Sequence, residues 1–334
     1  MRIAIYDYDR YFSDRICNVM NKKYGSLAKW TALNENQLIN IKEDKSDVIL
    51  LPLEMKNDMY NDNEAIIYFS EKKIDGICNW TYKYQTASSL NEAISQIYKA
   101  KSLYRTDEVL ENCKLISFIS LGGGMGNSTM ATGASQYYAR EGKKVLYLNL
   151  KTLGGTGYFD IEGSASIYQI VQDISKKQGN LNRLVEGIRI DPSGIFVAEG
   201  NVDPEKYSEI LSCDFLKILC LVQKIGKFDN IIIDAEISHT ETFNAIIKNS
   251  DSICFILDGS ELGNKKFQWV LPYLSNIDNL VQNKIRIIFN KYRIMPKVRK
   301  EMEASVIGGL GYVEGSSYKD VLAKIHNMNL WARL

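Results

Sequence analysis

Histidine, proline and paired cysteines are scarce in this chain. Among its 334 residues are two histidines, five prolines and six cysteines, and no two cysteines form a Cys-x-x-Cys pair. With so few candidate ligands a zinc site is not expected. Few prolines argue against long disordered linkers. No apolar run reaches the roughly 18 residues of a membrane-spanning helix, so an ordinary globular protein is expected.

Neither sign of charge dominates. The chain has 41 Lys+Arg against 40 Asp+Glu, a net charge of +1, which gives no electrostatic argument for binding nucleic acid. The cysteines lie scattered in apolar segments, which is typical of reduced core cysteines in the cytoplasm. Acidic residues follow the first apolar residues, where a signal peptide would continue apolar. We therefore expect a cytoplasmic protein with no nucleic-acid partner.

Two patterns of alternating strands and helices follow one another. Before residue 105, strands are expected at 3–6, 48–51 and 66–69, and helices at 9–24, 35–42 and 87–104. After residue 112, strands are expected at 115–120, 145–149, 194–197, 230–234, 252–257 and 284–289, and helices at 128–141, 208–225 and 240–249. Such alternation predicts parallel strands with crossover helices. The fold class is therefore α/β, with an open parallel sheet in each of two domains, 1–105 and 112–334.

A glycine-rich turn joins the strand at 115–120 to the helix that follows. Gly122, Gly123, Gly124, Gly126 and Asn127 lie in it, and Ser128 and Thr129 open the helix. A strand, a glycine turn and a helix together aim backbone N–H groups and the helix dipole at one point, which suits phosphate. Ser128 would offer its hydroxyl to Mg²⁺ and Thr129 would reach an inner phosphate. A tight turn whose glycines serve only packing is the alternative.

This turn resembles the deviant Walker A loop of the ParA/MinD superfamily, Lys-Gly-Gly-x-Gly-Lys-(Ser/Thr). Gly122 and Asn127 stand where the family has its two lysines. Since those lysines neutralise phosphate charge as the bond breaks, their loss should impair turnover more than binding. The resemblance implies ATP and Mg²⁺ as cofactors. It places the nucleotide on Gly123, Gly124, Met125, Gly126, Asn127, Ser128 and Thr129.

Three later segments extend the resemblance. Residues 228–234 look like a Walker B strand, in which Asp234 would hold the Mg²⁺ shell through water while Ser128 offers its hydroxyl; an Asp capping the next helix is the alternative. Where the family reads Asp-x-Asp, this chain has Asn149 and Lys151. Lys151 either reaches the γ-phosphate or is a solvated loop lysine.

The last strand of the domain ends in a polar pair. Asn290, followed by Lys291, resembles the superfamily's late strand, whose Asn reads adenine because an amide both donates and accepts. A turn-forming Asn is the alternative.

The N-terminal domain resembles a response-regulator receiver. Asp7 and Asp9 follow its first strand as the receivers' acidic pair does, and Ser70 and Lys83 stand at the receivers' Ser/Thr and Lys positions. Pro52 occupies the expected phospho-acceptor position and cannot accept a phosphoryl group. This domain is therefore expected to be an interaction surface without phosphotransfer, unless the acidic pair are ordinary loop residues.

A degenerate receiver followed by a ParA/MinD-like domain is the layout of the TadZ/CpaE-type pilus-assembly proteins. That resemblance implies a cytoplasmic homodimer at the cell pole or the inner face of the membrane, with pilus and secretion assembly proteins as partners. It implies ATP binding with slow or absent hydrolysis. An active MinD/ParA-like ATPase for positioning or partitioning, and an interaction scaffold without nucleotide, are the alternatives. The tail at 318–334 predicts an amphipathic helix that packs on the domain or contacts a membrane.

Overall fold

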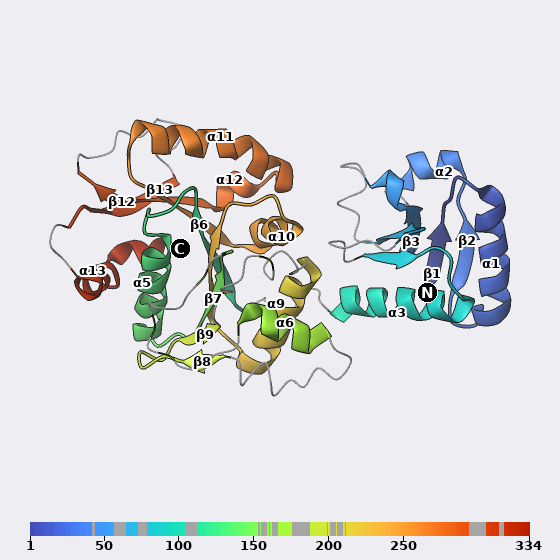
Figure 1. The fold of residues 1–334 in the computed structure, drawn as a ribbon, viewed down its shortest axis with the longest axis horizontal. Coiled ribbons are helices and arrows are strands. Elements are labelled where there is room, and N and C mark those ends of the chain that lie inside the picture. Colours follow the sequence, from blue (N-terminus) through green and yellow to red (C-terminus); the bar gives the residue numbers. More distant parts are fainter. Residues whose placement is uncertain are drawn as a thin grey trace. The chain divides into compact units, whose positions relative to one another are not determined.

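The computed structural model describes most of the chain. The described residues are 1–41, 44–56, 65–72, 79–103, 112–152, 154, 159, 161, 166–175, 188–198, 200, 205, 210, 212–293, 305–313 and 317–334. The chain divides into two compact units, Met1–Arg105 and Thr106–Leu334 (Figure 1). Of the polar stretch expected as a boundary at 105–112, residues 105–111 lie outside the described residues.

The first unit is built on a five-stranded parallel sheet in the order β2-β1-β3-β4-β5. Its strands are β1 Arg2–Ile5, β2 Lys29–Ala32, β3 Val48–Pro52, β4 Ile66–Ser70 and β5 Trp80–Tyr82. Its helices are α1 Arg10–Tyr24, α2 Glu35–Ile39, η2 Leu53–Met55 and α3 Ala87–Leu103. This strand order is that of the flavodoxin-like doubly wound sheets.

Both faces of this sheet are covered. Apolar residues of α1 and α3 pack on one face, and Leu38 of α2 packs on the other. Leu90, Ile94, Ile97 and Tyr98 of α3 all contribute to the first cluster, as the helical spacing predicts. Burial on both sides explains why β3 and β4 are apolar throughout rather than alternating.

The second unit is built on an eight-stranded sheet in the order β13-β12-β11-β6-β10-β7-β9-β8. Its strands are β6 Lys114–Ser120, β7 Val145–Leu150, β8 Arg189–Ile190, β9 Phe196–Ala198, β10 Asn230–Glu236, β11 Ser252–Leu257, β12 Ile285–Tyr292 and β13 Val306–Gly311. All neighbours pair in parallel except β8 with β9, which are antiparallel. The expected α/β class with parallel sheets is therefore confirmed, apart from this short edge strand.

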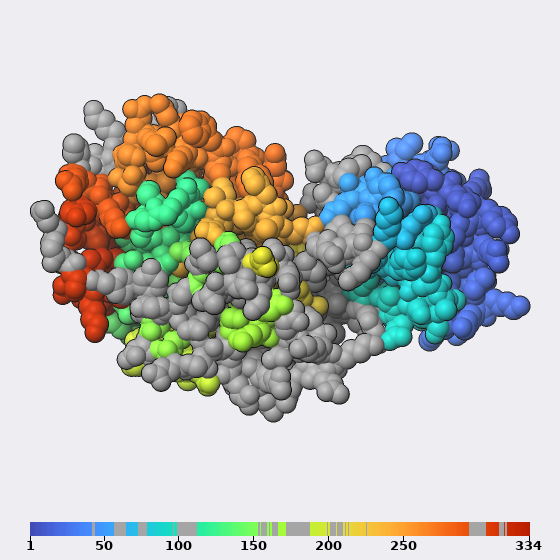
Figure 2. Space-filling model, in the orientation of Figure 1, coloured from blue at the N-terminus to red at the C-terminus, as the bar shows by residue number. Residues whose placement is uncertain are grey.

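Helices cover both faces of the second sheet. They are α5 Asn127–Arg140, α6 Ile167–Ser175, α9 Ser212–Gly226, α10 Glu241–Asn249, α11 Glu261–Ile277, α12 Val281–Lys284, α13 Tyr318–Ile325 and η4 Asn329–Arg333. Apolar residues of α5, α13 and η4 form one core, and those of α6, α9, α10 and α11 form the other (Figure 1). Figure 2 shows α11 on the surface of this unit, and its Trp269 is 68% exposed.

Three helices differ from expectation. The helix expected at 35–42 ends at Ile39, and the one expected at 208–225 begins at Ser212. The tail at 318–334 is not one helix, because α13 ends at Ile325 and the chain resumes as η4. There Trp331 is fully buried and its Nε1 donates to the Ile325 carbonyl oxygen at 2.7 Å. The tail thus packs on its own domain. No helix in the described part of the chain is long and apolar enough to cross a membrane.

Candidate functional site

The glycine-rich turn lies between the end of β6 and the start of α5. Gly124 and Gly126 have left-handed φ angles of 75° and 87°, which side-chain-bearing residues rarely adopt. Gly126 is the N-cap of α5. Since the first N–H groups of a helix have no intrahelical acceptor and glycine offers no capping side chain, these donors are open to an anion. The local geometry is therefore that of a phosphate-binding loop.

Asn290 and Lys291, at the end of β12, hold this loop in place. The Nδ2 of Asn290 donates to the Met125 carbonyl oxygen at 2.8 Å, and the Nζ of Lys291 donates to the Gly124 carbonyl oxygen at 2.8 Å. A Cβ on Gly126 would overlap the Asn290 amide. Asn290 is thus a buried support for the loop, and its contact with adenine stays a prediction.

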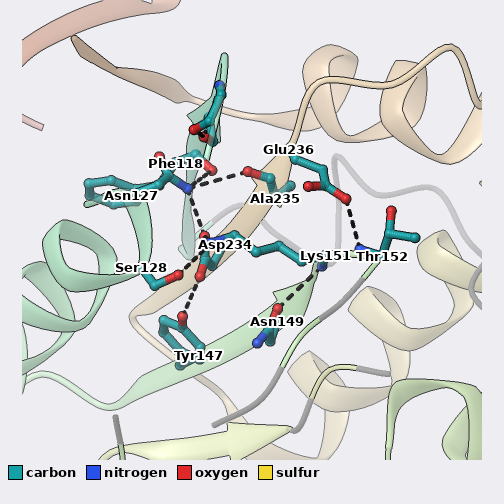
Figure 3. Close-up of polar contacts among 12 residues, drawn as sticks. Phe118, Asn127, Ser128, Tyr147, Asn149, Lys151, Thr152, Asp234, Ala235 and Glu236 are labelled. Atoms are coloured by element: carbon teal, nitrogen blue, oxygen red, sulfur yellow. Dashed lines mark hydrogen bonds and ion pairs between the residues drawn. The ribbon is translucent and has the colours of Figure 1, made fainter. Parts of the chain in front are cut away.

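Asn127 does not point outward as a phosphate-binding lysine would. It is 4% exposed, and its Nδ2 lies 2.9 Å from the Phe118 carbonyl oxygen, 2.7 Å from Asp234 Oδ1 and 3.3 Å from the Ala235 carbonyl oxygen (Figure 3). The amide therefore ties the start of α5 to the ends of β6 and β10.

Asp234 is the centre of a buried polar cluster. It is fully buried, and in the sheet it lies beside Phe118 of β6 and Asn149 of β7. Tyr147 donates its hydroxyl to Asp234 Oδ2 at 2.7 Å. Asp234 does not cap the following helix, since the N-cap of α10 is Thr240, whose side chain accepts from the Phe243 N–H. That alternative is therefore wrong.

Lys151, two residues beyond Asn149, closes the cluster. Its Nζ lies 3.1 Å from Asp234 Oδ1 and donates a hydrogen bond to Ser128 Oγ (Figure 3). Only 18% of its side chain is exposed, so it is not a solvated loop lysine. The register of β10 against β7 explains the contact, because it brings the end of β7 beside Asp234.

Ser128 and Asp234 are the pair of side chains expected to hold Mg²⁺. The Lys151 ammonium already joins these two side chains. Asn127 also donates to Asp234 Oδ1, and Tyr147 donates to Oδ2. Oδ1 of Asp234 thus already has two donors, Lys151 and Asn127, and Oδ2 has one, Tyr147, which leaves little room for direct coordination of a cation. Mg²⁺ therefore does not fit while Lys151 holds this position, and its binding here stays a prediction.

Lysines from three other elements surround the glycine loop. Besides Lys151 and Lys291, Lys266 of α11 places its Nζ 4.0 Å from where a Cβ on Gly122 would lie. Gly122 and Asn127 carry no charge, and among the described residues these three lysines bring positive charge to the loop. Sequence patterns missed Lys266 and Tyr147, because one lies on a distant helix and the other inside an apolar strand.

In the first unit, Asp7 and Lys83 form a buried ion pair. Lys83 Nζ lies 2.8 Å from Asp7 Oδ2, with 13% and 3% of the two side chains exposed. Burial acts to lower the pKa of Lys83, but the hydrogen bond and ion pair with Asp7 outweigh it and hold that pKa above its ordinary value. Ser70 ends β4, and its Oγ accepts from the Lys72 N–H. Pro52 ends the neighbouring strand β3 and brings no carboxylate to this site.

Solved structures give the class of fold. A ParA family ATPase from Chlorobium tepidum has a TM-score of 0.54 and 17% identity, covering 66% of this chain and 96% of that one. A plasmid partition protein from Borrelia burgdorferi has a TM-score of 0.50 and 19% identity, covering 66% and 98%. The second unit thus has the fold of ParA-type P-loop ATPases. No family model and no curated protein matches the chain by sequence.

Proposed function

We propose that the second unit binds ATP on the loop from Gly123 to Thr129 and hydrolyses it slowly or not at all. The observation that carries the proposal is the uncapped start of α5, formed on two left-handed glycines and surrounded by lysines. Open N–H donors and positive charge are what a polyphosphate requires. The ParA-type fold, in which this loop follows a central strand, supports the same site.

Weak hydrolysis follows from the residues beside the loop. Fast phosphoryl transfer needs cations on the oxygens that gain charge and a group that positions the attacking water. Gly122 is uncharged, and Asn127 is buried against β6 and β10. Lys151 stands in place of the family's second Asp, which helps to position the attacking water. When bound ATP is hydrolysed slowly, the chain stays in the conformational state that binds ATP better, because the nucleotide stabilises that state. The unit would then act as a stable switch between nucleotide-free and nucleotide-bound states.

The cellular role that fits this switch is that of a localisation factor. We propose a TadZ/CpaE-type homodimer at the cell pole or the inner face of the membrane, acting with pilus and secretion assembly proteins. The first unit supports a role in interaction: Asp7 and Lys83, at positions that resemble those of a receiver, form an ion pair, and Pro52 stands where the phospho-acceptor is expected. Such a unit would present a surface to partners without phosphotransfer.

Titration calorimetry of the full chain with ATP tests the proposal. A Cβ on Gly123 meets no described atom within 4 Å, and its φ is not left-handed, so a side chain fits there without strain. Gly123→Glu and Gly123→Gln then differ only in charge. We expect micromolar binding by the natural chain, and affinity at least about tenfold lower for the Glu variant than for the Gln variant.

The other outcomes separate the alternatives. Steady release of phosphate that Asp234→Ala abolishes would indicate an active positioning or partitioning ATPase. Absence of ATP binding by the natural chain would refute the proposal and leave an interaction scaffold without nucleotide.

A further inference from the structure

The place between Ser128 and Asp234 holds a cation that belongs to the chain. The Lys151 ammonium donates to the hydroxyl of Ser128 and forms an ion pair of 3.1 Å with Asp234 (Figure 3). These are the two side chains that the sequence assigns to a magnesium ion. We infer that Lys151 takes the place of the divalent cation, so that the loop binds nucleotide without a metal; this rests on the proposed nucleotide binding.

The neighbours of Asp234 hold the ammonium there. Asn127 and Tyr147 donate to its two oxygens, each at 2.7 Å, and fix the carboxylate in one orientation. Asp234 is fully buried, so it needs a positive partner to remain charged. Lys151 supplies that charge, and a metal at this place would have to displace the ammonium.

The ammonium keeps a donor for the ligand. It has three N–H groups, of which Ser128 and Asp234 take two among the described residues. The side chain is 18% exposed and lies beside Ser128, the second residue of α5. The third N–H is therefore available to a phosphate oxygen, which is the contact that a bound magnesium would otherwise make.

The charges around the loop suit a nucleotide that binds without a metal ion. Lys151 with Asp234 is neutral, whereas Mg²⁺ with Asp234 would leave one positive charge. Lys266 and Lys291 lie beside the loop and restore positive charge from outside it. These two lysines would thus offset the phosphate charge that a magnesium ion offsets in other nucleotide sites.

Nucleotide titrations with and without metal test this inference. We expect the full chain to bind ATP with the same affinity, within about twofold, in EDTA and in Mg²⁺. Lys151→Ala should bind about tenfold more weakly in EDTA and regain affinity in Mg²⁺, which can then reach Ser128 and Asp234. Lys265→Ala is the matched control, since Lys265 pairs with Glu261 on the outside of α11 and should leave both affinities unchanged.

Thermal unfolding without nucleotide gives a second readout. Mg²⁺ should raise the melting temperature of Lys151→Ala by filling the vacated position, and should leave that of the natural chain unchanged. If the Ala variant does not fold, Lys151→Gln, which keeps a donor and loses the charge, gives the same comparison.

Each result has a distinct meaning. ATP binding by the natural chain that requires Mg²⁺ would overturn the inference and leave the proposed function standing. An equal rise in melting temperature for both chains would overturn it as well. No ATP binding in either buffer would refute the proposed function and the metal-free binding together, and the melting comparison would then decide only whether Lys151 is the resident cation.

Discussion

The packing of Asn290 against Gly126 predicts how two glycines of one loop differ. Gly124 and Gly126 both have left-handed φ, so alanine at either position costs about 1–2 kcal/mol of backbone strain. A Cβ on Gly124 meets no described atom within 4 Å, whereas one on Gly126 overlaps the Asn290 amide. Gly124→Ala is therefore a control for strain alone.

The additional cost at Gly126 follows from the contacts of Asn290. To make room, the Asn290 side chain must leave the Met125 carbonyl oxygen, to which it donates at 2.8 Å. Asn290 is 4% exposed, and leaving a buried polar group without its partner costs about 1–3 kcal/mol. Gly126→Ala should therefore destabilise the second unit by about 1–3 kcal/mol more than Gly124→Ala does.

Hydrogen exchange in urea measures the difference. The readout is the amide exchange of β10, a central strand that exchanges only when the second unit opens. In an Asn290→Ala background the extra cost of Gly126→Ala should disappear, since the overlapping group is gone. Equal destabilisation by the two glycine substitutions would refute the argument.

Three further predictions concern burial and charge. Lys83→Met should destabilise the first unit by about 3–5 kcal/mol, measured by hydrogen exchange of β1. The control Arg10→Met should cost less than about 1 kcal/mol, because the Arg10 side chain is 82% exposed. Because folding raises the pKa of Lys83, the stabilisation from its positive charge is complete below the unfolded pKa of about 10.4 and is lost as pH rises through the folded pKa. Urea titrations at increasing pH should show this loss of stability in the natural chain and not in Lys83→Met. Trp331→Ala should cost about 3–5 kcal/mol and Trp269→Ala under about 0.5 kcal/mol, by thermal unfolding; similar losses would contradict the burial of the tail. Burial raises the pKa of the Cys113 thiol to about 12, so mass-mapped alkylation near neutral pH should leave it unlabelled until the chain unfolds, and rapid native labelling would contradict this.

Long apolar strands could be predicted from the sequence, and short edge strands could not. The expected strand at 252–257 coincides with β11, because six buried residues in a row leave an unambiguous pattern. The edge strands β2, β5, β8 and β13 were missed. Of these, β5 has three residues and β13 reads Val-Ile-Gly-Gly-Leu-Gly, so neither of these two carries a strand pattern of its own. Their pairing with a longer neighbour makes them strands.

The position of the site could be predicted, but not the direction of its side chains. The order of strand, glycine turn and helix locates the loop, and the acid that follows Ile231–Ile233 locates Asp234. That Asn127 turns inward and Lys151 reaches Ser128 depends on how β10 pairs with β6 and β7. Such pairing joins residues more than 80 positions apart, which local spacing does not encode.

Because Asn127 and Lys151 both contact the Asp234 carboxylate, substitutions at positions 127 and 151 are coupled. A lysine at 127 alone would break the amide contacts of Asn127 with the Phe118 and Ala235 carbonyl oxygens and bring a second ammonium to a carboxylate that already has one. Loss of Lys151 alone would leave a buried acid without a counter-charge. Each single change is therefore disfavoured, whereas the paired change brings in one ammonium as it removes another and so keeps one counter-charge for Asp234. Sequences descended from this chain should therefore change positions 127 and 151 together or keep both residues.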